Sequence, residues 1–205
     1  MAKRDGQGIK REKSEAMKQT EEWNAAKSRI ENQIKELRHR LHTCPEISGQ
    51  ERKTKAALKQ FLEESTNLEL QDCGGGFYAV YRSSTADSAK KGVAFRADYD
   101  ALALPEGGAA HLCGHDGHAS ALCGAALLLE QQVKEGRDPG RNVYFLFQPA
   151  EETGAGAAPC CELFDKEDIE ENNCKCAFCL CTGYDCTVMK KKKKRIYSEW
   201  RNIGC

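Results

Sequence analysis

The stretch Val143-Tyr-Phe-Leu-Phe147, which Pro149 follows closely, decides the fold of this chain. Its unbroken apolar run predicts a strand that is buried on both faces, and the proline ends that strand. Gly92-Val-Ala-Phe-Arg-Ala97 predicts a second strand of the same kind. Strands buried on both faces are typical of parallel sheets that helices cover on both sides.

The segments around these two strands alternate between helix and strand patterns. Residues 119–133 are rich in alanine and leucine and predict a buried helix between the two strands. Upstream, Phe77-Tyr-Ala-Val-Tyr81 predicts another strand and Leu68-Glu-Leu-Gln71 a short one, with the turn Cys73-Gly-Gly-Gly76 between them. This alternation predicts an α/β fold whose sheet carries helices on both faces.

Two helices are predicted before the strands. Apolar residues at gaps of three and four predict a long helix, which Pro45 ends. These residues are Trp23, Ala26, Ile30, Ile34, Leu37 and Leu41. Ser48-Gly-Gln-Glu51 has the form of a capping box and predicts the start of a second helix. Residues 1–15 are polar with mixed charges, and we expect them to be disordered.

The composition excludes several partners. Among 205 residues, 31 are basic and 31 acidic, so the chain has no net charge that would attract nucleic acid or an anionic membrane. No apolar run is long enough to span a bilayer, and no apolar segment of a signal peptide follows the charged start. We therefore expect a cytoplasmic protein that binds neither nucleic acid nor a membrane. For a protein of that location, the 12 cysteines do not predict a disulfide framework.

The densest group of metal-binding side chains is His111-Leu-Cys-Gly-His-Asp-Gly-His118, where a loop meets the predicted helix. Cysteine and histidine are usual ligands of divalent transition metals. A single glycine separates Cys113 from His115, so both side chains can turn to one point. Asp116 could hold a ligand imidazole by its second nitrogen. The alternative is a loop with coincidental polar residues, which this density of ligands makes less favoured.

Pairs of carboxylates follow both buried strands. Glu151 and Glu152 come after the strand that Pro149 ends, and one of them could bind a metal while the other moves protons. A solvated acidic turn is the alternative. Asp98 and Asp100 follow the other strand and could be ligands or scaffold, of which the sequence slightly favours scaffold.

The character of the chain changes after about residue 165. Acidic residues give way to a cysteine cluster at residues 174–181 and then to the basic run 190–195. The cysteine spacing differs from the usual pair of CxxC motifs, and the basic run is more typical of a solvated tail than of a polyanion site. We expect residues 16–165 to form one domain and residues 166–205 a divergent tail.

Four motifs in this order resemble the M20 family, in its branch of aminoacylases and of hippurate and indoleacetyl-amino-acid hydrolases. They are Arg38-His-Arg-Leu-His-Thr-Cys-Pro-Glu46, Phe95-Arg-Ala-Asp-Tyr-Asp-Ala-Leu102, His111-Leu-Cys-Gly-His-Asp-Gly-His118 and Leu146-Phe-Gln-Pro-Ala-Glu-Glu152. The resemblance implies a three-layer, zinc-exopeptidase-like α/β sheet. It also implies a two-metal hydrolase that cleaves the amide bond of a small N-acyl amino acid or peptide-like substrate, and that can form a homo-oligomer.

The resemblance further implies roles for four residues. Cys113, His115 and Glu152 would be metal ligands, and Glu151 would be the general base that takes a proton from water and returns it to the leaving amine. The thiolate of Cys113 favours zinc among divalent metals, and the family also allows manganese, cobalt or nickel.

The last part of the chain departs from the family. Cys179 stands where the family has a further ligand histidine, and no histidine follows His118. The family also has a last ligand histidine near its C-terminus and an inserted lid and dimerisation domain. We therefore expect an incomplete sheet and active site, in a truncated or frame-shifted product that could be inactive. The alternatives are a non-catalytic fragment that binds one metal, and a binding module that acts through the basic tail.

Overall fold

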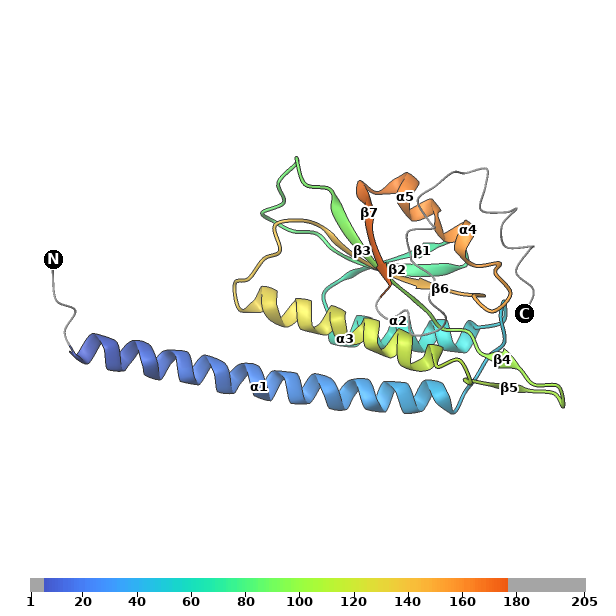
Figure 1. Cartoon of the computed structure of the whole chain (residues 1–205), viewed down its shortest axis with the longest axis horizontal. Coiled ribbons are helices and arrows are strands. Elements are labelled where there is room, and N and C mark those ends of the chain that lie inside the picture. The colour runs from blue at the N-terminus through green and yellow to red at the C-terminus, as the bar shows by residue number, and fades with distance from the viewer. Residues whose placement is uncertain (1–5, 177–205) are drawn as a thin grey trace.

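The computed structural model describes residues 6–176, which form three layers around a five-stranded sheet (Figure 1). A second, two-stranded sheet pairs β4 (Leu102–Ala103) with β5 (Ala109–Ala110). Helices α2 (Arg52–Ser65) and α3 (His115–Lys134) cover one face of the five-stranded sheet, and α1 (Gly6–His42) packs on the outer side of α3. The short helices α4 (Ala157–Cys160) and α5 (Glu162–Lys166) cover the other face. The predicted α/β class, with helices on both faces of the sheet, is confirmed.

The sheet has five strands in the order β1-β2-β6-β3-β7. They are β1 (Glu69–Cys73), β2 (Gly76–Tyr81), β6 (Val143–Gln148), β3 (Gly92–Asp98) and β7 (Ile169–Cys176). The central strand β6 is parallel to β3 and antiparallel to β2, and β7 is parallel to β3. The two strands that the sequence predicts to be buried, β3 and β6, therefore form a parallel pair in a mixed sheet, in which an antiparallel hairpin of β1 and β2 forms one edge.

The pleat of β6 divides the core between the two faces. Phe145 and Phe147 lie in the cluster under α1, α2 and α3, where Phe147 stacks on Phe77 with ring centroids 4.6 Å apart. Tyr144 and Leu146 lie in the cluster under α4 and α5. Every residue of β6 is buried, as its apolar run predicts.

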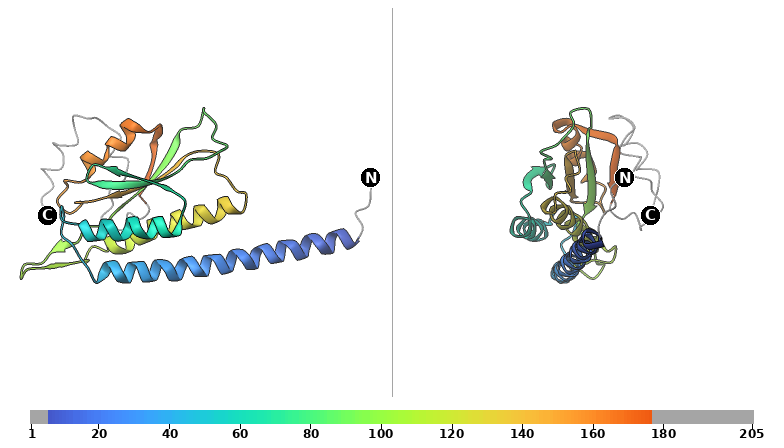
Figure 2. Two further views of the ribbon diagram at one scale, coloured as in Figure 1. Left: turned by 180° about the vertical axis from the view of Figure 1, so that it is seen from behind. Right: turned by 90° about the vertical axis from the view of Figure 1, so that its left-hand side faces the viewer.

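Helix α1 is longer than its apolar stripe. Leu37 and Leu41 are buried against the rest of the molecule, whereas the N-terminal part of the helix extends beyond the body (Figure 1, Figure 2). The helix includes residues 6–15, for which the sequence predicts disorder. No proline interrupts this segment, and its lysines, arginine and glutamates favour a helix. None of the described helices combines the length and apolarity needed to cross a membrane.

The start of α2 differs from the predicted capping box. The hydroxyl of Ser48 donates to Asp100 instead, at 2.6 Å, because the loop before the helix bridges to the segment after β3. The carboxylate of Glu46 accepts the backbone N–H groups of Thr54 at 2.7 Å and Lys53 at 3.2 Å, and so it caps the helix.

The sheet continues past the predicted domain boundary at residue 165. Strand β7 begins at Ile169 and pairs with β3, so the first residues of the predicted tail belong to the sheet. Cys179 and the basic run 190–195 lie outside the described residues.

Candidate metal centre

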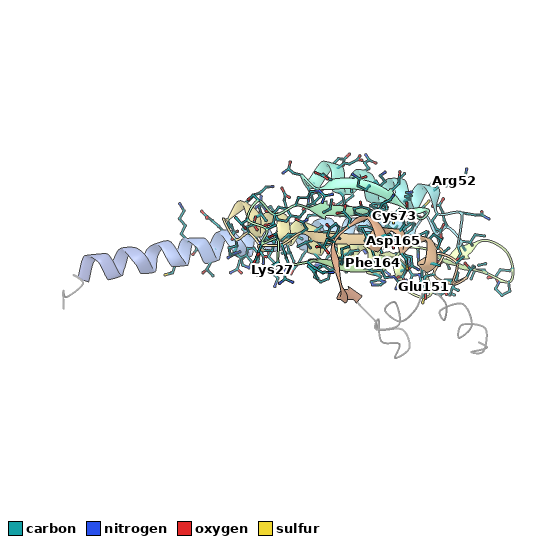
Figure 3. All side chains as sticks on the ribbon, turned by 90° about the horizontal axis from the view of Figure 1, so that it is seen from above. Lys27, Arg52, Cys73, Glu151, Phe164 and Asp165 are labelled. Atoms are coloured by element: carbon teal, nitrogen blue, oxygen red, sulfur yellow. The ribbon has the colours of Figure 1, made fainter. Side chains whose placement is uncertain are left out.

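The candidate centre lies at the carboxyl ends of β3 and β6, as open α/β sheets predict. The two strands are in parallel register, so that Asp98 pairs with Gln148 at this edge of the sheet. The turn that carries Glu151 follows β6, and α3 begins at the same edge. Figure 3 shows Glu151 at the same end of the molecule as Arg52, the first residue of α2.

The imidazole of His115 is at the middle of the centre. Its Nε2 atom lies 3.6 Å from Asp98 Oδ1, 3.7 Å from Glu151 Oε2 and 3.7 Å from Glu152 Oε1. Two groups of three side chains have ligand atoms within 4.8 Å of one another. One is Cys113, His115 and Glu152, and the other is Asp98, His115 and Glu151.

The first of these groups fits a divalent metal ion well. It combines a thiol, an imidazole and a carboxylate, which are the usual zinc ligands. The Oε1 atom of Glu152 is buried and has no hydrogen-bond partner, so it offers a free lone pair toward the centre. The three predicted ligands Cys113, His115 and Glu152 are thus brought together, and Glu151 lies beside them.

Asp100 sets the orientation of the central imidazole. The Nδ1 atom of His115 lies 3.0 Å from Asp100 Oδ1 and 3.1 Å from the Asp100 carbonyl oxygen. When Nδ1 carries the proton and donates it to Asp100, the lone pair of Nε2 faces the candidate ligands. The sequence motif indicates that Asp116 could take this role, and that prediction is wrong.

Asp116 faces helix α1 rather than the candidate centre. Its Oδ2 atom lies 2.7 Å from His42 Nδ1 and 3.0 Å from Arg38 Nε. The reason is helical geometry, because consecutive residues of a helix point about 100° apart. The side chain next to His115 therefore leaves the centre, and it holds the end of α1 against the start of α3.

Asp100 also connects two other segments to the centre. It accepts the hydroxyl of Ser48 at 2.6 Å and the backbone N–H of Glu152 at 2.9 Å. Burial raises the pKa of Asp100, but hydrogen bonds from His115 and Ser48 outweigh burial and lower it. Asp100 is therefore a charged scaffold residue, which the sequence slightly favours.

Asp98 is neutralised by two partners. Arg96 lies 3.0 Å from its Oδ2 atom, and the Nδ1 atom of His118 contacts its Oδ1 atom. Burial raises the pKa of Asp98, but the hydrogen bond from His118 and the charge of Arg96 outweigh burial and lower the pKa to about 2. Arg96 also donates to Gln148 at 3.0 Å, so the guanidinium is fixed between the two strands.

The surrounding carboxylates determine the protonation of the centre. Burial lowers the pKa of His115, but the hydrogen bond to Asp100 and the charges of Asp98 and Asp100 raise it to about 9. Burial and the charge of Asp98 raise the pKa of Glu151. A cation that binds here would replace the proton of His115, and Glu151 has the raised pKa that suits a general base.

His111 lies apart from both ligand groups. Its ring is buried, both ring nitrogens lack a hydrogen-bond partner, and it stacks on His42 at 6.2 Å between centroids. Burial, the first of several causes, lowers the pKa of His111. Arg38 and His42 both stand in the motif that begins at residue 38, but nothing in the sequence alone indicates their contacts with Asp116.

Comparisons with known proteins agree with this geometry. Residues 94–193 match the model of peptidase family M20/M25/M40. N-acetyl-L-cysteine deacetylase of Bacillus subtilis is 38% identical over 141 residues, which cover 63% of this chain and 32% of that protein. The matched range 94–193 contains both ligand groups and extends beyond residue 165, where the sequence predicts a divergent tail.

Two solved structures are similar to the described fold. One is a Bacillus subtilis dinuclear metal binding peptidase from the M20 family, with 33% identity and a TM-score of 0.58 over 72% of this chain and 42% of that chain. The other is a putative aminohydrolase from methicillin-resistant Staphylococcus aureus, with 25% identity and a TM-score of 0.60 over 72% of this chain and 39% of that chain. The chain thus spans less than half the length of these relatives.

Proposed function

This chain belongs to peptidase family M20/M25/M40, and we propose that it carries part of the active site of a metal-dependent hydrolase that cleaves the amide bond of N-acyl amino acids. One observation carries the proposal. Cys113, His115 and Glu152 converge to within 4.8 Å, and Glu151 lies beside them with a raised pKa. A ligand group next to a carboxylate that can move a proton is what metal-assisted hydrolysis requires.

Each residue of the proposed site has a distinct part in the reaction. Cys113, His115 and Glu152 would hold a divalent cation, which when bound polarises a carbonyl and lowers the pKa of water. Glu151 would accept the proton of the attacking water and deliver it to the leaving amine. Asp100 would keep the proton of His115 on Nδ1, so that Nε2 remains available as a ligand.

The substrate class rests on the relatives. The Bacillus subtilis relative is described as a deacetylase of N-acetyl-L-cysteine, an N-acyl amino acid. We propose the same class for this chain, with a small N-acyl amino acid or peptide-like substrate.

The metal content rests on both the relatives and the ligands. The similar peptidase is described as dinuclear, so we propose two ions in the complete site. Cys113, His115 and Glu152 would hold one of them, and the thiol of Cys113 favours zinc over manganese, cobalt or nickel.

The test is the hydrolysis of N-acetyl and N-benzoyl amino acids by the purified chain with zinc, manganese or cobalt. Turnover that Glu151→Gln lowers by about 100-fold or more would support catalysis by this chain, because the amide cannot accept a proton. Glu63→Gln, an exposed position on α2, is the matched control and should retain activity. Absence of turnover with every metal would contradict the proposal for this chain.

A non-catalytic metal-binding fragment is the second candidate. It is favoured by the small number of ligands that the described residues bring together, because each group contains three side chains. Stoichiometric metal binding that requires Cys113, without turnover of any substrate, would support this candidate over the first.

A further inference from the structure

The turn that carries Glu151 and Glu152 has an unusual backbone. Ala150 has a φ of 49°, and it is the only residue other than glycine with a positive φ in the described part of the chain. This left-handed conformation is unfavourable for a residue with a Cβ atom. The Ala150 carbonyl accepts the N–H groups of Ala155 and Gly156, both at 3.1 Å, and these bonds close the turn.

Buried carboxylates hold the backbone on both sides of Glu151. The N–H of Ala150 donates to Glu51 Oε1 at 2.8 Å, and the N–H of Glu152 donates to Asp100 Oδ2 at 2.9 Å. Glu51 is 6% exposed and Asp100 is 1% exposed. Hydrogen bonds from a backbone amide to a charged acceptor are strong when both groups are buried.

The carboxylate of Glu51 makes no capping bond at its own helix. Glu51 precedes α2 as its N-cap residue, but its side chain accepts no N–H of that helix. The capping contacts come from Glu46 instead. A buried carboxylate that is not used at its own helix therefore serves a residue 99 positions away in the chain.

We propose that Glu51 is a positioning residue for the proposed metal centre, because it holds Ala150 in the left-handed conformation that directs Glu151 and Glu152 toward His115. Without this acceptor, the Ala150 amide becomes a buried donor with no partner. The backbone then relaxes to a favourable φ, and the two glutamates turn away from the imidazole. This inference rests on the proposed function only in assigning a purpose to that direction.

The first test measures the turn itself, in the metal-free full chain. Hydrogen exchange of the amides in residues 150–156 is compared between the wild type and Glu51→Ala. We expect exchange about 10-fold faster or more in the variant, because its Ala150 amide loses a buried acceptor. The matched control is Glu46→Ala, which removes a carboxylate from the same helix start but touches no residue of the turn. Equal exchange in Glu51→Ala and wild type, or an equal rise in both variants, would overturn the inference.

The second test measures the consequence by titration with Co²⁺. Because the chain has 12 cysteines, binding at Cys113 is read from the part of the thiolate charge-transfer absorption that Cys113→Ser abolishes. We expect Glu51→Ala to bind about 10-fold more weakly or worse, as residues that orient ligands usually do when they are lost. Glu51→Gln keeps an acceptor oxygen and should bind like the wild type. Ala150→Gly in the Glu51→Ala background should recover about five-fold, because glycine adopts a positive φ without a steric penalty.

The outcomes separate the two proposals. A wild-type chain that binds no cobalt would reject the proposed function, while the exchange experiment would still decide the role of Glu51. A Glu51→Ala variant that binds cobalt as tightly as the wild type would reject the positioning role and leave the proposed function standing.

Discussion

The side chain of Asp100 connects three segments that are far from it in the sequence. Its carboxylate accepts hydrogen bonds from a histidine of α3, a serine of the loop before α2 and the backbone of the Glu152 turn. One side chain thus fixes the orientation of His115 and the position of Glu152 together. The loss of this side chain should affect metal binding more than it affects folding.

Asp100→Asn tests this role. The amide can accept only through one oxygen, so either His115 or Glu152 loses its side-chain acceptor. We expect the affinity for Co²⁺ to fall about 10- to 100-fold, as is usual when the partner of a ligand histidine is lost. The measurement is competition with a chelator. Asp168→Asn, an exposed position, is the control, and an equal loss of affinity in both variants would contradict the prediction.

The pH dependence of stability should report on Asp98. Its pKa in the folded chain, about 2, is below its ordinary value of 3.8, so its contribution to stability is present above about pH 4. That contribution is lost as the pH falls from about 4 to 2, and it corresponds to about 2 kcal/mol.

The measurement is urea unfolding of the metal-free chain between pH 5 and 2, because protonation of Asp98 falls in this window. The free energy of unfolding should decline less steeply in Asp98→Asn than in the wild type, since the asparagine does not titrate. Asp168→Asn should decline as the wild type does. Parallel curves for Asp98→Asn and wild type would show that Asp98 is not held in its charged form.

At the scale of elements, helix α3 connects the candidate centre to the core. Its first residue is the candidate ligand His115, and further along the helix Leu122 is fully buried under the sheet. In contrast, Leu112 just before the helix is 72% exposed. Two leucines ten positions apart therefore have opposite environments.

This contrast gives a prediction for stability. Leu122→Ala should lower the free energy of unfolding by about 2–5 kcal/mol, because it leaves a cavity under a helix that packs on β3. Leu112→Ala should change it by less than about 0.5 kcal/mol. Urea unfolding of both variants is the measurement, and a similar small loss in each would mean that α3 packs loosely on the sheet.

At the scale of the whole molecule, the centre joins segments that are far apart in the sequence. Strand β3, helix α3 and the turn after β6 each supply at least one of its side chains. A bound cation would therefore connect all three segments, and it should stabilise the folded chain as a ligand does.

Metal removal tests this connection. At a free zinc concentration 100-fold above the dissociation constant, we expect zinc to stabilise the folded chain by about 2.7 kcal/mol. A chelator should remove this stabilisation and so lower Tm. Cys113→Ser should lose most of this effect. Cys44→Ser, which changes an exposed thiol away from the ligand groups, should retain it. A zinc-dependent shift of equal size in both variants would place the bound metal elsewhere.

The parts of the fold that follow local patterns could be predicted from the sequence. The apolar run at β6 and the spacing of Leu37 and Leu41 each depend on residues close in the chain. The antiparallel pairing of β2 with β6 could not be predicted, because no local pattern states which strands become neighbours.

The candidate centre likewise has some features that local sequence motifs indicate and others that depend on contacts between distant residues. The ligands Cys113, His115 and Glu152 stand in dense motifs, so sequence reasoning could single them out, and their roles remain predictions. The contacts of Asp100 with His115 and of Glu51 with Ala150 join residues 15 and 99 positions apart. Nothing in the sequence around these carboxylates indicates such partners, which the folded chain alone brings together.

The order of strands in the sheet also determines when each strand can pair during synthesis of the chain. Strand β6 lies between β2 and β3, yet it follows both in the chain. During synthesis, β2 and β3 therefore emerge from the ribosome with their inner edges unpaired, and they stay so until residue 148 has followed. Long-range pairing of this kind is slow and exposes strand edges to other chains. Nascent chains of this protein that stop before β6 should therefore need a chaperone most.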